Sequence, residues 1–197
     1  MATYSTGLMK SGWAVTMSAI ARYADEGVTP GSFYNSWGYF LSAQKVFNKQ
    51  HSLSFVTFGA PTKRTNSSAV AQEAYDLASD NLYNPNWGWQ NGKKRNAKVV
   101  EAFDPTAIIN WVWKPKEGTT LNTGVGFRSS NYASSALNWC NASDPRPDYY
   151  RYLPSYYIDH QEEYDLYVDK WTNDESQRQI DWDNLYQTNY LAKEYAG

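Results

Sequence analysis

The sequence has few of the residues that build reactive or metal-binding sites. A single cysteine, Cys140, excludes an intramolecular disulfide, and no CxxC pair or cysteine–histidine cluster exists for zinc. The two histidines, His51 and His160, lie far from any serine or cysteine motif, so neither is predicted to be catalytic. The sequence also lacks a nucleophile elbow, an HExxH motif and a phosphate-binding glycine loop. We therefore expect no enzyme, no cofactor and no metal site.

Two further absences bear on partners and location. The formal net charge of -2 and the pI of about 5.7 argue against nucleic-acid binding, which needs a basic surface. No run of about 18 apolar residues occurs, so no transmembrane helix is predicted, although membrane strands escape this test. Residues 1–13, MATYSTGLMKSGW, do not read as a signal peptide, because no basic start precedes an apolar stretch.

Aromatic residues are abundant: 17 Tyr, 9 Trp and 7 Phe. Tyr and Trp pair a flat apolar body with a polar tip, so they suit boundaries between wet and dry regions. A sugar-binding surface, a protein interface and the edge of a lipid bilayer are three such boundaries.

The stretch GWAVTMSAIARYADEG shows the alternation of a strand with two unlike faces. One face contains Trp13, Val15, Met17, Ala19, Ala21 and Tyr23, and the other contains Ala14, Thr16, Ser18, Ile20 and Arg22. Similar patterns predict further strands over residues 3–9, 33–47, 52–60, 106–114 and 119–130. The predicted fold class is all-β, an antiparallel up-and-down meander of about six strands.

The connections between these strands alternate between short turns and long segments. Residues 61–104 and residues 131–197 are long and polar, with helical patterns at residues 68–80 and 181–196. In a meander, alternate connections lie at opposite ends of the strands, and outer-membrane barrels have short periplasmic turns and long outer loops. We therefore expect residues 1–130 to hold barrel strands with an extracellular loop at about 61–104, and residues 131–197 to form an extracellular loop segment.

A soluble antiparallel domain is the competing interpretation, because alternation alone does not identify what the apolar face contacts. Three details favour a bilayer. The apolar face from Trp13 to Tyr23 spans about 33 Å, which at a tilt of about 40° projects to the expected height of about 25 Å. The opposite faces are small and hydrophilic, and aromatic residues recur at both ends of the strands. The predicted membrane-interface anchors are Trp13, Tyr23, Trp37, Trp111 and Trp113.

Three compositionally unusual stretches carry a family resemblance. They are NLYNPNWGWQNGKKRN (residues 81–96), FDPTAIINWVWKPKEGTTLNTGVGFR (103–128) and ASDPRPDYYRYLPSY (142–156). Together they resemble the barrel of TonB-dependent outer-membrane receptors, especially the subgroup with a carboxypeptidase-like regulatory domain. RQIDWDNLYQTN (178–189) resembles the loop that follows in that subgroup.

The resemblance implies a plugged barrel of about 22 strands in a Gram-negative outer membrane. Such a barrel imports a scarce ligand, energised by the inner-membrane TonB complex through the plug. The chain shows no plug, no TonB box and about six strands, so we expect a fragment that is not transport-competent alone. Its expected partners are outer-membrane lipid, the rest of the barrel and plug, and an imported ligand that no residue identifies.

Candidate ligand-binding residues lie in the long loops: Trp87, Trp89, Tyr149, Tyr150 and Tyr152. Packing of the loops on themselves is the simpler role for the NPNWG and tyrosine-rich stretches. Likewise, a solvated charge run is the simpler interpretation of the cluster of Lys93, Lys94 and Arg95. Asp144, Asp148 and Asp159 lack a calcium-loop spacing and read as a solvated turn. The alternatives for the whole chain are a soluble β-sandwich carbohydrate-binding module and a β-fold hydrolase.

Overall fold

A computed structural model describes residues 1–139 and 142–195; Cys140 lies outside the described residues. The chain is mostly β, with 42% strand and 22% helix. It divides into two compact units, each built from three chain segments. Unit 1 comprises residues 1–23, 34–63 and 100–133, and unit 2 comprises residues 24–33, 64–99 and 134–197.

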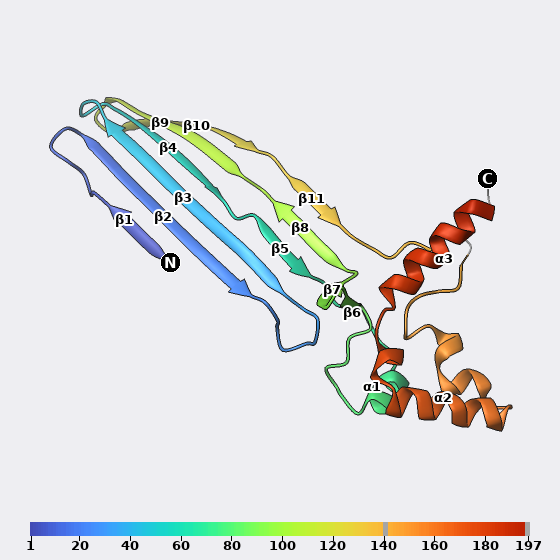
Figure 1. Cartoon of the computed structure of the whole chain (residues 1–197). Coiled ribbons are helices and arrows are strands. Elements are labelled where there is room, and N and C mark those ends of the chain that lie inside the picture. Colours follow the sequence, from blue (N-terminus) through green and yellow to red (C-terminus); the bar gives the residue numbers. More distant parts are fainter. Residues whose placement is uncertain (140–141, 196–197) are drawn as a thin grey trace. The chain divides into compact units, whose positions relative to one another are not determined.

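A nine-stranded sheet accounts for most of unit 1 (Figure 1). Its strands are β1 (Ala2–Ser5), β2 (Trp13–Ala24), β3 (Tyr34–Val46), β4 (His51–Gly59), β5 (Thr62–Thr65), β8 (Val99–Phe103), β9 (Thr106–Lys116), β10 (Thr119–Arg128) and β11 (Asn131–Ser134). The longest strands pair in the order β1-β2-β3-β4-β9-β10, which is an antiparallel meander.

The sheet has six positions side by side, which we call lanes, and each lane holds one strand or two strands placed end to end. Three of the lanes are interrupted near one end of the sheet. β4 and β5 both pair with β3, and residues 60–61 separate them; Asp104 and Pro105 separate β8 from β9. Pro61 and Pro105 have no backbone N–H, so neither can donate a ladder hydrogen bond. β11 follows β10 and pairs with β8. Six lanes therefore contain nine strands.

The register places the apolar residues of neighbouring strands on one face. Phe55 lies opposite Ile109, and Ile109 lies opposite Val125. Toward the other edge of the sheet, Tyr4 lies opposite Met17, and the Lys45 ammonium lies over the Trp13 ring at 5.1 Å from its centroid. We call this surface the apolar face; it carries Trp13, Val15, Met17, Ala19, Ala21 and Tyr23.

Short turns join the lanes at one end. Residues 6–12, 47–50 and 117–118 connect β1 to β2, β3 to β4 and β9 to β10. Gly118 has a φ of +75°, a left-handed conformation that favours glycine in so tight a turn. The segments of unit 2 are the other connections, between β2 and β3 and between β5 and β8, together with the chain after β11.

Unit 2 is mainly helical and contains a two-stranded hairpin. Its elements are α1 (Gln72–Ala78), β6 (Trp87–Gln90), β7 (Lys93–Asn96), the 3-10 helices η1 (Tyr150–Tyr152), η2 (Pro154–Tyr157) and η3 (Glu175–Arg178), α2 (Gln161–Asn173) and α3 (Trp182–Tyr195). Two hydrophobic clusters stabilise it. Ala74, Tyr83, Leu153 and Trp171 form one, and Ala97, Ile180, Trp182 and Leu185 form the other.

The sequence predicted the long strands and the C-terminal helix well. β2 and α3 match their expected ranges closely, but the helix expected over residues 68–80 is shorter, because α1 ends where Ser79 adopts a left-handed φ of 52°. The sequence pattern did not predict α2, whose first turn and exposed face are strongly polar, nor the short strands β5 to β8 and β11. None of the helices among the described residues is long and apolar enough to cross a membrane.

Candidate functional site

The apolar face of unit 1 is a large exposed hydrophobic surface. The side chain of Met17 on β2 is 48% exposed and that of Trp37 on β3 is 54% exposed. Val125 and Phe127 on β10 are 69% exposed each. The other large exposed side chains of this face are Tyr4, Trp13, Tyr23, Leu53, Ile109, Trp111 and Leu121. Monomeric soluble proteins rarely leave so many contiguous apolar side chains exposed.

The opposite face, which we call the polar face, is lined by small and hydrophilic side chains. Thr3 and Ser18 hydroxyls lie 2.9 Å apart, as do those of Ser5 and Thr16, in cross-strand hydrogen bonds. Large exposed apolar side chains on it are few: Phe40, Phe58 and Ile108. The two faces of the sheet therefore differ in polarity.

Aromatic side chains concentrate toward the ends of the apolar face. Near the short turns, the rings of Trp111, Trp113 and His51 stack in parallel with centroids 5.8–6.0 Å apart. Toward the other end, Trp37 and Tyr39 lie 6.1 Å apart and Tyr23 is exposed. Rings with polar tips are enriched at membrane–water interfaces, where both their surfaces are satisfied.

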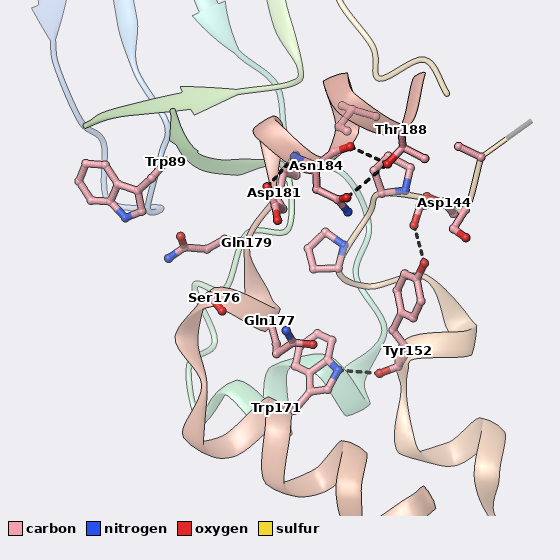
Figure 2. A pocket seen from close by; sticks show the side chains of 16 residues that line it. Trp89, Asp144, Tyr152, Trp171, Ser176, Gln177, Gln179, Asp181, Asn184 and Thr188 are labelled. Carbon is pink, nitrogen blue, oxygen red and sulfur yellow. Dashed lines mark hydrogen bonds between the residues drawn. The ribbon is translucent and has the colours of Figure 1, made fainter. Parts of the chain in front are cut away.

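Unit 2 contains a hollow of about 670 Å³ (Figure 2). Its lining includes two carboxylates, Asp144 and Asp181, and the indoles of Trp89 and Trp171. It also includes seven neutral hydrogen-bonding side chains: Ser143, Tyr152, Ser176, Gln177, Gln179, Asn184 and Thr188. The Thr188 hydroxyl donates to the Asn184 carbonyl at 2.6 Å, which holds both at the first turns of α3. A volume of this size is typical of small-molecule sites.

The structure brings only some of the five expected ligand-binding residues together. Trp89 and Tyr152 line the hollow, and Figure 2 shows them on different elements. Trp87 is buried, and a Cβ at Gly31 would overlap its ring. Tyr149 and Tyr150 form an edge-to-face pair with centroids 4.6 Å apart, and neither lines the hollow. Other lining residues, such as Gln177, Asn184 and Thr188, were not expected from the sequence, because isolated amides and hydroxyls carry no motif.

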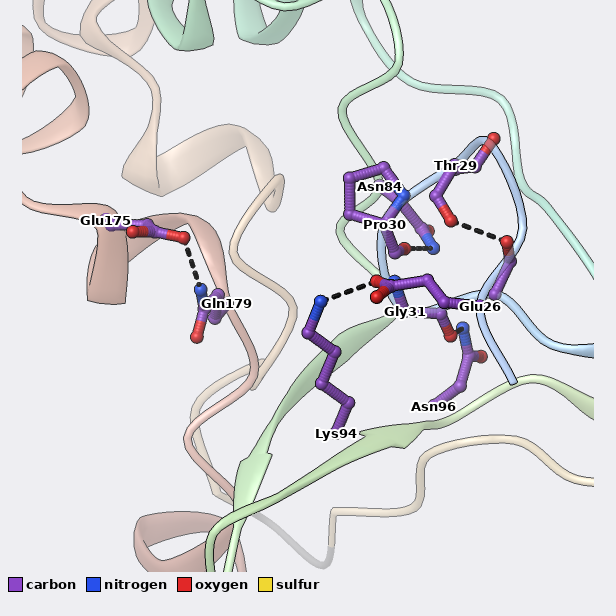
Figure 3. A network of polar contacts seen from close by, with 10 residues as sticks. Glu26, Thr29, Pro30, Gly31, Asn84, Lys94, Asn96, Glu175 and Gln179 are labelled. Carbon is purple, nitrogen blue, oxygen red and sulfur yellow. Dashed lines mark hydrogen bonds and ion pairs between the residues drawn. The ribbon is translucent and has the colours of Figure 1, made fainter. Parts of the chain in front are cut away.

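The NPNWG stretch has a packing role in this fold. Asn84 donates from its side chain to the Pro30 carbonyl at 2.9 Å and accepts from the Asn86 backbone N–H at 3.1 Å. Asn96 donates to the Gly31 carbonyl at 3.0 Å (Figure 3). Asn84, Asn86 and Asn96 are buried with their polar groups hydrogen-bonded, as buried amides must be. They fix the segment of residues 24–33 against the hairpin within unit 2.

Two residues of the basic cluster make contacts within unit 2 and remain exposed to solvent. Lys94 pairs with Glu26 at 2.5 Å and lies over the rings of Trp87 and Trp89 (Figure 3). Arg95 stacks over Trp182 at 4.2 Å and donates to the Tyr186 hydroxyl at 2.7 Å. The charge run thus fastens the β6–β7 hairpin to its neighbours, and only Lys93 of the three has no such contact in the described network.

Carboxylates in the DPRPDYYR stretch are held by internal partners. The Asp144 carboxylate accepts from the Arg146 guanidinium at 2.5–3.1 Å, and the Tyr152 hydroxyl donates to the Asp144 carbonyl at 2.9 Å. Burial raises the pKa of Asp148 above its ordinary value, while the nearby Arg146 charge opposes that rise. Within residues 1–139 and 142–195, no three His, Cys, Asp or Glu side chains gather closely enough to hold a metal ion.

Comparison of the chain with models of protein families, with curated proteins and with solved structures finds no match in any of the three. The proposal below therefore depends on the fold, its surfaces and the sequence resemblance.

Proposed function

We propose that this chain is a barrel segment of a TonB-dependent outer-membrane receptor. In this proposal the apolar face contacts lipid, the polar face lines the lumen, and unit 2 forms ligand-facing loops. The parent receptor binds and imports a scarce ligand, and the segment itself performs no chemistry. The resemblance of residues 81–96, 103–128 and 142–156 supports the choice of family.

The observation that carries the proposal is the exposure of the apolar face between aromatic ends. At about 25 cal/mol per Å² of apolar surface, leaving such a face in water would cost many kcal/mol, so it needs an apolar environment. The sheet is long enough for lipid: β2, β3 and β9 have 12, 13 and 11 residues, and a tilted membrane strand needs about 9–11.

A soluble β-sandwich would cover the apolar face with a second sheet. Outside the nine-stranded sheet, the strands of the described residues form just the two-stranded β6–β7 hairpin of unit 2. Nothing in the described part of unit 1 offers a covering layer, so lipid is the better-supported occupant of this face.

Quenching by brominated lipid tests the proposal. The nine tryptophans divide into four in unit 1 (Trp13, Trp37, Trp111 and Trp113) and five in unit 2 (Trp87, Trp89, Trp139, Trp171 and Trp182). In vesicles of bromine-labelled phosphatidylcholine, we expect the wild-type emission to be partly quenched. A variant with Phe at the four unit 1 positions should lose that quenching.

Equal fractional quenching in the wild type and the four-Phe variant would contradict the proposal. So would a chain that is monomeric in buffer without detergent and whose unit 1 unfolds cooperatively there. A five-Phe variant of the unit 2 tryptophans is the matched control, and its remaining emission should be more strongly quenched than that of the wild type.

A further inference from the structure

The polar face of unit 1 contains a hollow that the proposed function does not use. Its volume is about 490 Å³, within the range of about 300–1,000 Å³ that is usual for small-ligand sites. Its apolar lining includes Ile20, Phe40 and Phe58, and Asp104 is the one charged residue among the residues that line it.

The hollow lies where the lanes are interrupted. Gly59 and Ala60 line it just before Pro61 breaks the lane of β4 and β5, and Asp104 lines it just before Pro105. Gly38 keeps the space open, because a Cβ there would come within 3.0 Å of the Ile20 Cγ2 atom. Ile20 is an apolar residue on a hydrophilic face. It belongs to a local apolar patch rather than to an extended core.

Asp104 has unused hydrogen-bonding capacity. Its Oδ2 atom lies 3.5 Å from the Arg128 guanidinium, whose side chain is largely exposed, so this ion pair is weak. Its Oδ1 atom is buried and has no hydrogen-bond partner among the described residues. The Asp104 side chain is nevertheless 43% exposed and lines the hollow, so its Oδ2 atom can accept hydrogen bonds from a donor placed there.

We infer that this hollow binds an organic ammonium ion, with the ammonium on Asp104 Oδ2 and the hydrocarbon part against Ile20, Phe40 and Phe58. An ammonium supplies three donors to a carboxylate, and charge-assisted hydrogen bonds are stronger than neutral ones. The aromatic faces add cation–π attraction and apolar contact. All the lining residues belong to unit 1, so the inference does not rest on the membrane proposal.

Titration calorimetry of the full chain in detergent, with 2-phenylethylammonium as the probe, tests the inference. We expect the ammonium to bind at least about tenfold more tightly than 2-phenylethanol, its neutral analogue. Asp104→Asn should abolish this preference. Glu117→Gln, which removes an exposed carboxylate from the β9–β10 turn, should leave it unchanged. Detergent micelles without protein give the partitioning background.

Phe58→Ala separates the two parts of the site, since it should weaken both probes by a similar factor and keep the preference for charge. The inference is overturned if Asp104→Asn binds the ammonium as tightly as the wild type while retaining its near-ultraviolet circular dichroism. It is also overturned if inorganic ammonium competes at equal concentration, because the apolar lining would then contribute nothing.

Discussion

Polar residues in unit 2 act mainly as internal fasteners. Lys94, Arg95 and Asn96 follow one another along β7, and each connects the hairpin to a different neighbour: Glu26, Trp182 and Gly31. Because the side chains of successive strand residues point to opposite sides, one short strand can contact several chain segments. A charge run in a loop is therefore consistent with an ordered structure.

The ion pair between Glu26 and Lys94 gives a pH-dependent prediction. The Lys94 hydrogen bond and the Gly31 N–H lower the pKa of Glu26 below its ordinary value of 4.5. A lowered carboxyl pKa means that the stabilisation is complete above the ordinary value and is lost as the pH falls through the folded-state value. Glu26 and Lys94 are 41% and 35% exposed, so solvent screening limits the effect to under about 1 kcal/mol.

Glu26→Gln should therefore lower the stability of unit 2 near neutral pH, and the difference from the wild type should shrink as the pH falls below the ordinary carboxyl value of 4.5. Denaturant unfolding followed by near-ultraviolet circular dichroism measures both values. Glu117→Gln, an exposed carboxylate in the β9–β10 turn of unit 1, is the control and should match the wild type at each pH. A difference that grows on acidification would contradict a lowered pKa for Glu26.

At the scale of elements, alternation along each strand and the register between strands make the two faces of the sheet. β10 illustrates this, with Leu121, Val125 and Phe127 on the apolar face and Asn122, Gly124 and Gly126 on the other. A one-residue slip of any strand would exchange its two faces, so the pairing of Leu53 with Trp111 and of Phe55 with Ile109 maintains the difference.

Arginine substitutions on adjacent residues of β2 test the assignment of the faces. In lipid, Met17→Arg should destabilise the folded chain by about 2–4 kcal/mol, because it places a charge in the apolar band. Ser18→Arg should cost under about 1 kcal/mol, because Ser18 lies on the polar face and loses exposed hydrogen bonds to the Thr3 hydroxyl and the Ala2 carbonyl. Denaturant titration of vesicle-folded protein, followed by tryptophan emission, measures both. Equal losses would show that both faces meet the same solvent.

At the scale of the whole molecule, the two units are stabilised differently. Unit 2 has buried hydrophobic clusters that contain Trp171, 1% exposed, and Ile180, 2% exposed. Unit 1 is a single sheet whose large side chains stay exposed on the apolar face, and Val100 is the exception among the buried hydrophobic residues of the described chain. Unit 2 can therefore gain stability from its own burial, whereas unit 1 buries few of its own large apolar side chains.

Two separable unfolding transitions should follow from this difference. Trp171→Ala should destabilise the unit 2 transition by about 3–5 kcal/mol, because it removes a fully buried ring and its hydrogen bond to the Tyr152 carbonyl at 2.7 Å. Trp111→Ala, on the apolar face, should leave that transition unchanged and alter only the detergent-dependent one. Calorimetry at two detergent concentrations distinguishes the two transitions, because only that of unit 1 should shift with detergent. A single transition that both variants alter would contradict independent stabilisation of the two units.

The candidate site was harder to predict than the strands. Trp87, Trp89 and Tyr152 were all predicted to bind ligand because they are aromatic residues of long loops. Trp89 and Tyr152 line the hollow, whereas Trp87 is buried against Gly31. Asn184 and Thr188 line the hollow because α3 places residues four apart on one side, a placement that depends on where the helix packs. Residue type alone therefore does not distinguish an aromatic side chain that packs inside the unit from one that lines the hollow.

Local sequence was enough to specify the alternation of β2, β3, β9 and β10, the short turns between lanes, and the helical spacing of α3. Side-chain periodicity and turn chemistry act over a few residues, so these features need no distant partner. Packing of the whole chain was needed to show that Lys94 and Arg95 are bound internally and that Asn84 and Asn96 are buried. It was also needed to bring Ile20, Phe58 and Asp104 around one hollow. Those outcomes depend on segments distant in sequence, whose encounters no local pattern encodes.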